Sequence, residues 1–79
     1  MATIYQVDQV VDAKGQVCPM PVLMLAKAYR TLPSGKILRI SATDPGSVSD
    51  ISAWAAKTGA TLLESAVADG VYTFYLKKA

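Results

Sequence analysis

The chain has 79 residues, with 8 Lys and Arg, 6 Asp and Glu, no His, one Cys and a formal net charge of +2. At this length it forms a single domain, residues 1–79, that buries only roughly 60% of its unfolded surface, so chemistry is expected at the surface and not in a deep pocket. The composition excludes an intramolecular disulfide, a Cys/His zinc site and the His-based hydrolytic triads and dyads, and the charge is too small to indicate nucleic acid by itself.

The first half of the chain predicts a strand, a helix and a second strand. Residues 5–12 carry Val7 and Val11 on one side of a period-two pattern, which favours a strand. Residues 19–32 predict a helix, which Pro33-Ser34-Gly35 ends; its apolar positions recur at helical spacing, at Val22, Leu25, Tyr29 and Leu32. Residues 36–43 alternate, with Leu38, Ile40 and Ala42 on the better-buried side, and predict a central strand.

The second half predicts another helix and a hairpin. Ser47 and Asp50 resemble a capping pair, and an apolar line of Val48, Ile51 and Ala55 leads to Gly59, a typical helix end. Residues 61–67 and 71–77 flank Asp69-Gly70, a strong hairpin signal. The order β-α-β-α-β-β predicts an α+β, two-layer α/β sandwich: a four-stranded mixed sheet with two helices on one face.

The segment between the first strand and the first helix carries the candidate chemistry. Proline suits the first turn of a helix, so Pro19 and Pro21 predict a helix start with Cys18 as its N-cap, where the thiolate accepts from the Met20 N–H. The positive end of the helix dipole lowers a thiol pKa, and Gly15 permits the preceding loop. Lys14 is a candidate electrostatic helper. Without a His to move protons, this sulfur suits a nucleophile or carrier better than a hydrolytic centre.

Each of the candidate residues also has a purely structural interpretation. A lone Cys is often a small buried hydrophobe, a Lys in a loop is usually solvated, and Asp44 more often caps a turn than performs acid–base work. Trp54, Tyr72 and Phe74 could stack nucleic-acid bases, but such aromatics usually belong to the core or the sheet face.

The motif residues resemble the TusA-like sulfur-carrier family (SirA/YedF-type). Asp12, Gly15 and Cys18-Pro19-Met20-Pro21 follow the family pattern D-x-x-G-x-x-C-P-x-P. Further matching positions are Gly35, Thr43-Asp44-Pro45, Asp50-Ile51, Trp54 and Gly59. Two positions depart from related sequences: Met20 stands where some relatives have an acidic residue, and Ala60 where many have His.

The resemblance implies a sulfur carrier that holds sulfane sulfur as a persulfide on Cys18, with sulfurtransferase-type chemistry and not the self-contained turnover of an enzyme. It implies no cofactor or metal beyond that covalent sulfur. It implies a donor protein, either a cysteine desulfurase or rhodanese-like, and an acceptor sulfur-transfer protein of DsrE/TusD type, serving tRNA thiolation, cofactor synthesis or sulfur oxidation. A single Cys fits, because a second thiol in the chain would collapse the persulfide.

Partner contacts are expected on a second helical line that begins beside Cys18 and comprises Met20, Leu23, Met24 and Lys27. Methionine is common on adaptable binding surfaces, although ordinary helix packing explains the line equally well. We expect a cytoplasmic monomer without direct nucleic-acid contacts. We also expect no membrane contact, because no apolar stretch is long enough to span a bilayer. The competing hypothesis is a non-enzymatic nucleic-acid-binding or regulatory module.

Overall fold

The computed structural model describes residues 6–17 and 19–79, so the predicted nucleophile Cys18 lies outside the described residues. The elements follow the predicted order. They are β1 (Gln9–Ala13), α1 (Met20–Thr31), β2 (Ile37–Ala42), α2 (Ser47–Thr58), β3 (Thr61–Ala68) and β4 (Val71–Lys77).

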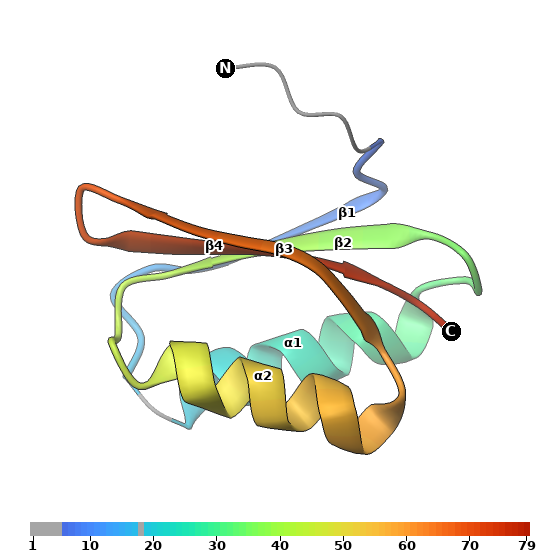
Figure 1. Cartoon of the computed structure of the whole chain (residues 1–79), viewed down its shortest axis with the longest axis horizontal. Coiled ribbons are helices and arrows are strands. Elements are labelled where there is room, and N and C mark those ends of the chain that lie inside the picture. The colour runs from blue at the N-terminus through green and yellow to red at the C-terminus, as the bar shows by residue number, and fades with distance from the viewer. Residues whose placement is uncertain (1–5, 18) are drawn as a thin grey trace.

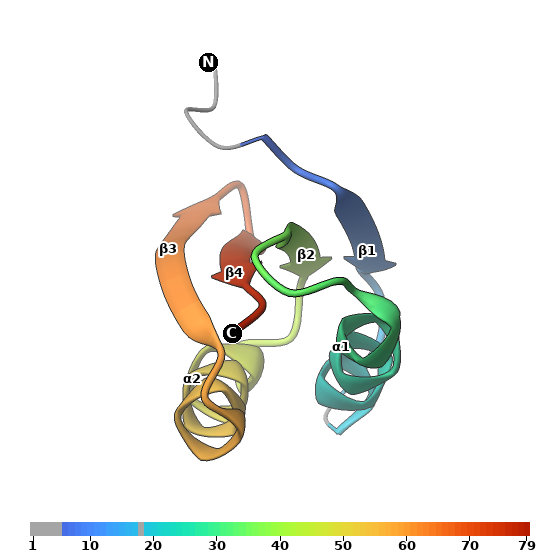
Figure 2. The same ribbon diagram turned by 90° about the vertical axis from the view of Figure 1, so that its right-hand side faces the viewer.

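The strands form one mixed sheet in the order β1-β2-β4-β3, in which β1 and β2 are parallel and the other neighbouring pairs are antiparallel. Both helices pack under the same face of this sheet, α1 beneath β1 and α2 beneath β3 (Figures 1 and 2). The predicted two-layer α/β sandwich is therefore confirmed. Within residues 6–17 and 19–79, no helix covers the other face of the sheet.

The core lies between the sheet and the helices. Leu38, Ile40 and Ala42 of β2 are fully buried, as their alternation predicted, and Ile51 and Ala55 anchor α2. The three aromatic side chains weighed for base stacking belong to this core: Phe74 is buried, and Trp54 and Tyr72 are half-buried against it. Since apolar burial is the main stabilising term in folding, these residues hold both helices against the sheet.

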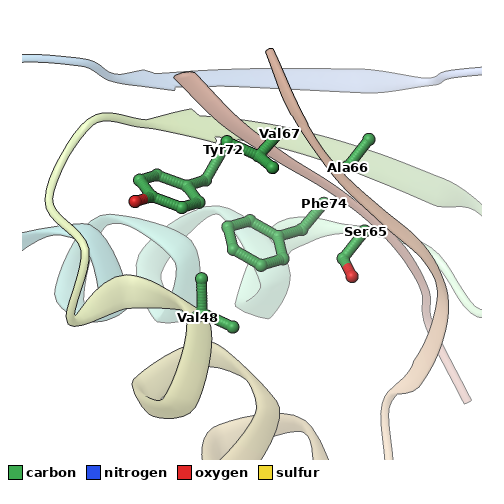
Figure 3. Close-up of a pocket in the computed structure, with 6 residues that line it drawn as sticks. All are labelled: Val48, Ser65, Ala66, Val67, Tyr72 and Phe74. Atoms are coloured by element: carbon green, nitrogen blue, oxygen red, sulfur yellow. The ribbon is translucent and has the colours of Figure 1, made fainter. Parts of the chain in front are cut away.

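Several predicted details differ from the structure. The first strand begins at Gln9, so the described residues 6–8 of the predicted strand lie outside it, and residue 5 lies outside the described residues. In α2 the N-cap is Gly46 and Ser47 is already helical; its buried hydroxyl donates to the Asp44 carbonyl at 2.6 Å, so the predicted Ser47–Asp50 capping pair is wrong. Val48, predicted on the buried line, is 41% exposed, because the β3–β4 hairpin extends beyond the start of α2 and leaves the first turn of this helix at an open end of the sheet (Figures 1 and 3).

The connections that follow β1, β2 and β3 meet at one edge of the molecule (Figure 1). Both helices run antiparallel to β1 and β2, so their N-termini lie at this edge too. We call it the motif edge and define it by residues 14–17, Pro19, 43–46 and 69–70. The first of these segments leads directly to the position of Cys18 in the sequence.

Candidate functional site

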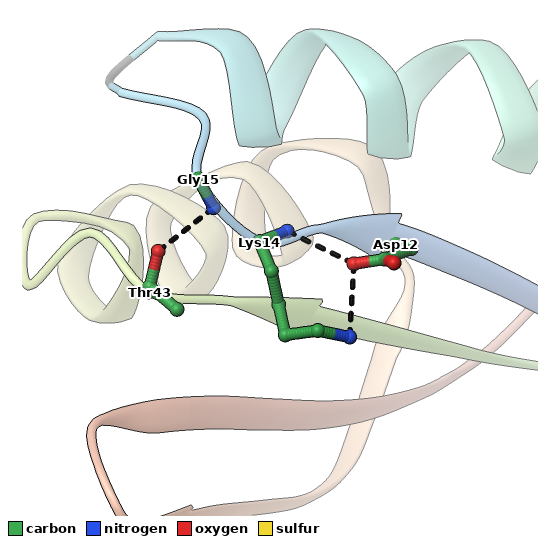
Figure 4. A network of polar contacts seen from close by, with 4 residues as sticks. All are labelled: Asp12, Lys14, Gly15 and Thr43. Carbon is green, nitrogen blue, oxygen red and sulfur yellow. Dashed lines mark hydrogen bonds and ion pairs between the residues drawn. The ribbon is translucent and has the colours of Figure 1, made fainter.

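The loop that leads to Cys18 is tied to the neighbouring strand end. Gly15 has a φ of +83°, in the left-handed region that favours glycine, and its N–H donates to the Thr43 hydroxyl at 2.9 Å (Figure 4). The Gln16 N–H donates back to the Ala13 carbonyl at 3.2 Å. The loops that follow β1 and β2 are therefore joined by a hydrogen bond, and Gly15 permits the loop as the sequence suggested.

The start of α1 is shifted by one residue from the prediction. Pro19, with φ −96° and ψ 15°, is the N-cap, Met20 is the first helical residue and Pro21 the second. The Met20 N–H donates to the Val17 carbonyl at 2.8 Å; the predicted bond from this N–H to the Cys18 thiolate lies outside the described residues. Both motif prolines shape the helix start, and Pro21, whose side chain is buried, also packs the first turn of α1.

Lys14, in the loop, forms an exposed ion pair with Asp12 near the end of β1. The Lys14 ammonium lies 3.0 Å from the Asp12 carboxylate, and the Lys14 backbone N–H donates to that carboxylate at 3.1 Å (Figure 4). The backbone hydrogen bond, together with the ion pair, lowers the pKa of Asp12. Lys14 therefore orders the turn before Gly15, and its role as an electrostatic helper toward Cys18 stays a prediction.

The predicted partner line on α1 is only partly a surface. Met20 and Leu23 are 40% and 55% exposed and Lys27 is exposed, whereas Met24 is half-buried and packs against the core. Val17, which is not among the predicted contact residues, is 69% exposed and precedes Cys18 directly in the sequence. Exposed apolar side chains thus stand directly before the motif, at Val17, and within it, at Met20.

Two hollows run along α1. One has a volume of about 500 Å³ between β1 and α1, and Met24 and Lys27 of the predicted line contribute to it. The other has a volume of about 390 Å³ between the two helices and begins at Pro19; it is lined by Pro19, Val22, Asp50, Ala53, Trp54 and Lys57. Across this helix pair Trp54 packs edge-on against Tyr29, with ring centroids 4.9 Å apart.

Metal-ligand clusters and membrane-spanning helices are both absent from the part of the chain that the structure describes. Within residues 6–17 and 19–79 no cluster of three or more His, Cys, Asp or Glu side chains could hold a metal ion. The two described helices are also too short to cross a bilayer.

Comparison with known proteins gives a consistent result. Residues 9–78 match the family described as Sulfurtransferase TusA. The chain is 44% identical over 72 residues to the sulfur carrier protein TusA of Allochromatium vinosum, covering 91% of this chain and 95% of that protein. It is 36% identical over 74 residues to the sulfur carrier protein TusA of Pseudomonas aeruginosa, covering 94% of each.

Among solved structures, a SirA-like protein from Desulfitobacterium hafniense superposes with a TM-score of 0.79 at 28% sequence identity. The superposition covers 87% of this chain and 95% of that one. The shared architecture therefore extends over nearly the whole chain.

Proposed function

Because this chain belongs to the TusA family of sulfurtransferases, we propose that it is a sulfur carrier that holds sulfane sulfur as a persulfide on Cys18. The Cys18 thiolate attacks the outer sulfur of a donor persulfide; the donor S–S bond breaks, the donor thiolate leaves and Cys18–S–SH forms. An acceptor thiolate then attacks the outer sulfur and regenerates the Cys18 thiolate. Each step exchanges one S–S bond for another, so no external oxidant or reductant is needed.

The observation that carries this proposal is that the family match spans residues 9–78 and so includes the C-P-x-P motif. The composition agrees, because the sequence has one Cys and no His. A lone thiol can hold a persulfide without a resolving thiol in the same chain, whereas it cannot run a His-dependent hydrolysis.

The motif edge supplies what a carrier needs besides the thiol. Pro19 ends the loop as the N-cap, and Pro21 fixes the first turn of α1 against the sheet. We assign contacts with partner proteins to Met20, Leu23 and Lys27, which are exposed on α1. Met24, on the same helical line, is half-buried and packs against the core. Such a surface, with apolar side chains beside a single cation, suits a transient protein contact better than a small ligand.

The partners of this reaction are a donor, either a cysteine desulfurase or a rhodanese-like protein, and an acceptor sulfur-transfer protein. The acceptor passes the sulfur toward tRNA thiolation, cofactor synthesis or sulfur oxidation. The carrier acts as a monomer in this scheme, which light scattering tests directly against its mass of 8.4 kDa.

The test is to load the reduced protein and weigh it. Wild type and Cys18→Ser are incubated with a cysteine desulfurase and cysteine, separately with a rhodanese and thiosulfate, and separately with inorganic polysulfide. We expect a thiol-reversible gain of one sulfur atom on wild type alone. A folded, reduced wild type that gains no sulfur from any of the three sources would overturn the proposal.

A further inference from the structure

Thr43 links the loop that leads to Cys18 to a second part of the fold. It follows the last residue of β2, and its exposed hydroxyl accepts the Gly15 N–H at 2.9 Å (Figure 4). The last paired residues of β1 and β2 are Ala13 and Ala42, so this hydrogen bond joins the two strand ends just beyond their parallel pairing. The proposed sulfur transfer gives the Thr43 hydroxyl no role so far.

The other hydrogen bonds of this loop are local. The backbone N–H groups of residues 14, 15 and 16 each donate one hydrogen bond. The first donates to the Asp12 carboxylate at 3.1 Å, and the third donates to the Ala13 carbonyl at 3.2 Å. Both of these acceptors belong to β1, which leads into the loop, so they shape the turn without fixing it relative to β2. Of the three acceptors, the Thr43 hydroxyl is the one that comes from a different part of the fold.

A second anchor lies on the other side of Cys18 in the sequence. Pro21, in the first turn of α1, is fully buried, and Gly15 is bound to Thr43. Each anchor is three residues from Cys18 in the sequence, so the chain between them is short. Without the Thr43 contact, this stretch is tied to the rest of the fold firmly at the α1 end alone. The loop then samples more conformations, because fewer of its backbone angles are restrained.

Sulfur transfer between two proteins depends on how such a loop is held. The attacking thiolate has to meet the outer sulfur of the persulfide in line with the S–S bond, and each group is carried by a docked protein. A misplacement of about 1 Å can slow such a reaction by about a hundredfold. A small anion such as inorganic polysulfide diffuses to the thiol and adapts to the conformation of the loop. The arrangement of the loop therefore matters for a protein partner and much less for polysulfide.

We infer that Thr43 is a positioning residue, whose hydroxyl holds the loop before Cys18 in the arrangement that protein-to-protein sulfur transfer requires. The inference rests on the proposed sulfur-carrier function and adds a residue from the neighbouring strand end. It applies to receipt and delivery of sulfur alike, because both steps exchange an S–S bond at the same thiol. Thr43 acts through the backbone of the loop and does not itself form or break a bond in the reaction.

The test compares three variants. Thr43→Val keeps the β-branched shape and removes the acceptor, whereas Thr43→Ser keeps the hydroxyl. Thr58→Val is the matched control, because it removes another exposed hydroxyl, which donates to the Trp54 carbonyl at 2.9 Å at the edge opposite the motif edge. The initial rate of loading is measured with the donor protein that loads wild type and with inorganic polysulfide. Hydrogen exchange of the Gly15 amide is measured by NMR, and urea unfolding shows that each variant is folded.

We expect Thr43→Val to slow loading by the donor protein about tenfold and to leave loading by polysulfide within about twofold of wild type. The Gly15 amide should exchange about tenfold faster in this variant, because it loses its acceptor. Thr43→Ser should return both rates to within about threefold of wild type, and Thr58→Val should change neither. Rescue by serine separates the effect of the hydroxyl from that of packing at this position.

Every other outcome is decisive. An unchanged donor rate or an unchanged Gly15 exchange rate in Thr43→Val would overturn the inference, as would a Thr43→Ser variant that restores neither. Equal slowing in Thr58→Val, or equal slowing of loading by polysulfide, would overturn it as well, because the effect would then not depend on the arrangement of this loop. If polysulfide loads wild type and neither donor protein does, the inference fails while the carrier proposal stands. Wild type that no source loads would overturn the proposed function itself, and the inference with it.

Discussion

Two glycines offer a matched test of how the loop before Cys18 contributes to function. Gly15 and Gly35 have φ angles of +83° and +82°, and a Cβ added to either would meet no atom within 4 Å. The cost of alanine at each position is therefore the backbone strain alone. Gly15 lies on the motif edge, whereas Gly35 lies in the turn between α1 and β2 at the opposite edge.

The expected stability loss is the same for both variants. An L-residue in the left-handed region costs roughly 1–2 kcal/mol, and the stiffer unfolded chain returns about 0.4–1 kcal/mol, so Gly15→Ala and Gly35→Ala should each lose about 1 kcal/mol. Urea unfolding measures this loss. Gly15→Asn should recover part of it, because asparagine adopts the left-handed region more readily.

The effect on sulfur transfer should differ. Strain at Gly15 moves a loop whose N–H donates to the Thr43 hydroxyl, so Gly15→Ala should slow loading by a protein donor by about tenfold, whereas Gly35→Ala should leave it unchanged. The assay is the initial rate of sulfur gain by mass spectrometry. Equal slowing in both variants, or none in Gly15→Ala despite its lost stability, would refute the assigned role of the loop.

Three further predictions concern stability. Because hydrogen bonding to Lys14 lowers the pKa of Asp12, wild type should be more stable than Asp12→Asn near neutral pH. This difference in stability should vanish as the pH falls from about 4 through the lowered pKa. A difference between the two urea midpoints that does not change with pH would contradict this prediction. Ile51→Val removes one methylene from a fully buried site and should cost about 1 kcal/mol in urea unfolding, and a cost below about 0.3 kcal/mol would mean that α2 is loosely packed. The Lys78 ammonium donates to the Tyr29 carbonyl at 2.8 Å and lies 4.4 Å from the centre of the Tyr29 ring. Lys78→Met should therefore lower the free energy of unfolding by about 1 kcal/mol. A thermal midpoint equal to that of wild type would show that this contact does not stabilise the fold.

The periodic parts of the sequence predicted the fold well. The alternation in β2 placed Leu38, Ile40 and Ala42 in the core, where all three are fully buried. The Asp69-Gly70 pair predicted the hairpin, and both residues have positive φ, as a tight primed turn requires. These signals work because side-chain alternation and turn chemistry depend on the local backbone alone.

The exact start of α1 and the exposure of side chains near the β3–β4 hairpin could not be predicted in the same way. Proline is compatible with both the N-cap and the first helical position, so the motif did not decide whether α1 begins at Pro19 or at Met20. The exposure of Val48 and Val67 depends on how far the hairpin reaches beyond α2, which is a tertiary property. No local pattern in the sequence indicates how far the hairpin extends beyond α2.

The C-terminus leaves the sheet at the edge opposite the motif. There the Lys78 N–H donates to the Lys36 carbonyl at 2.9 Å, and the Gly35 N–H donates to the Lys78 carbonyl at the same distance, which fixes the end of the chain beside the turn between α1 and β2. A reporter or a second domain joined after Ala79 would therefore point away from the motif edge. Such a fusion would leave this edge accessible to a partner protein, so the domain can be joined to a larger polypeptide without covering the site.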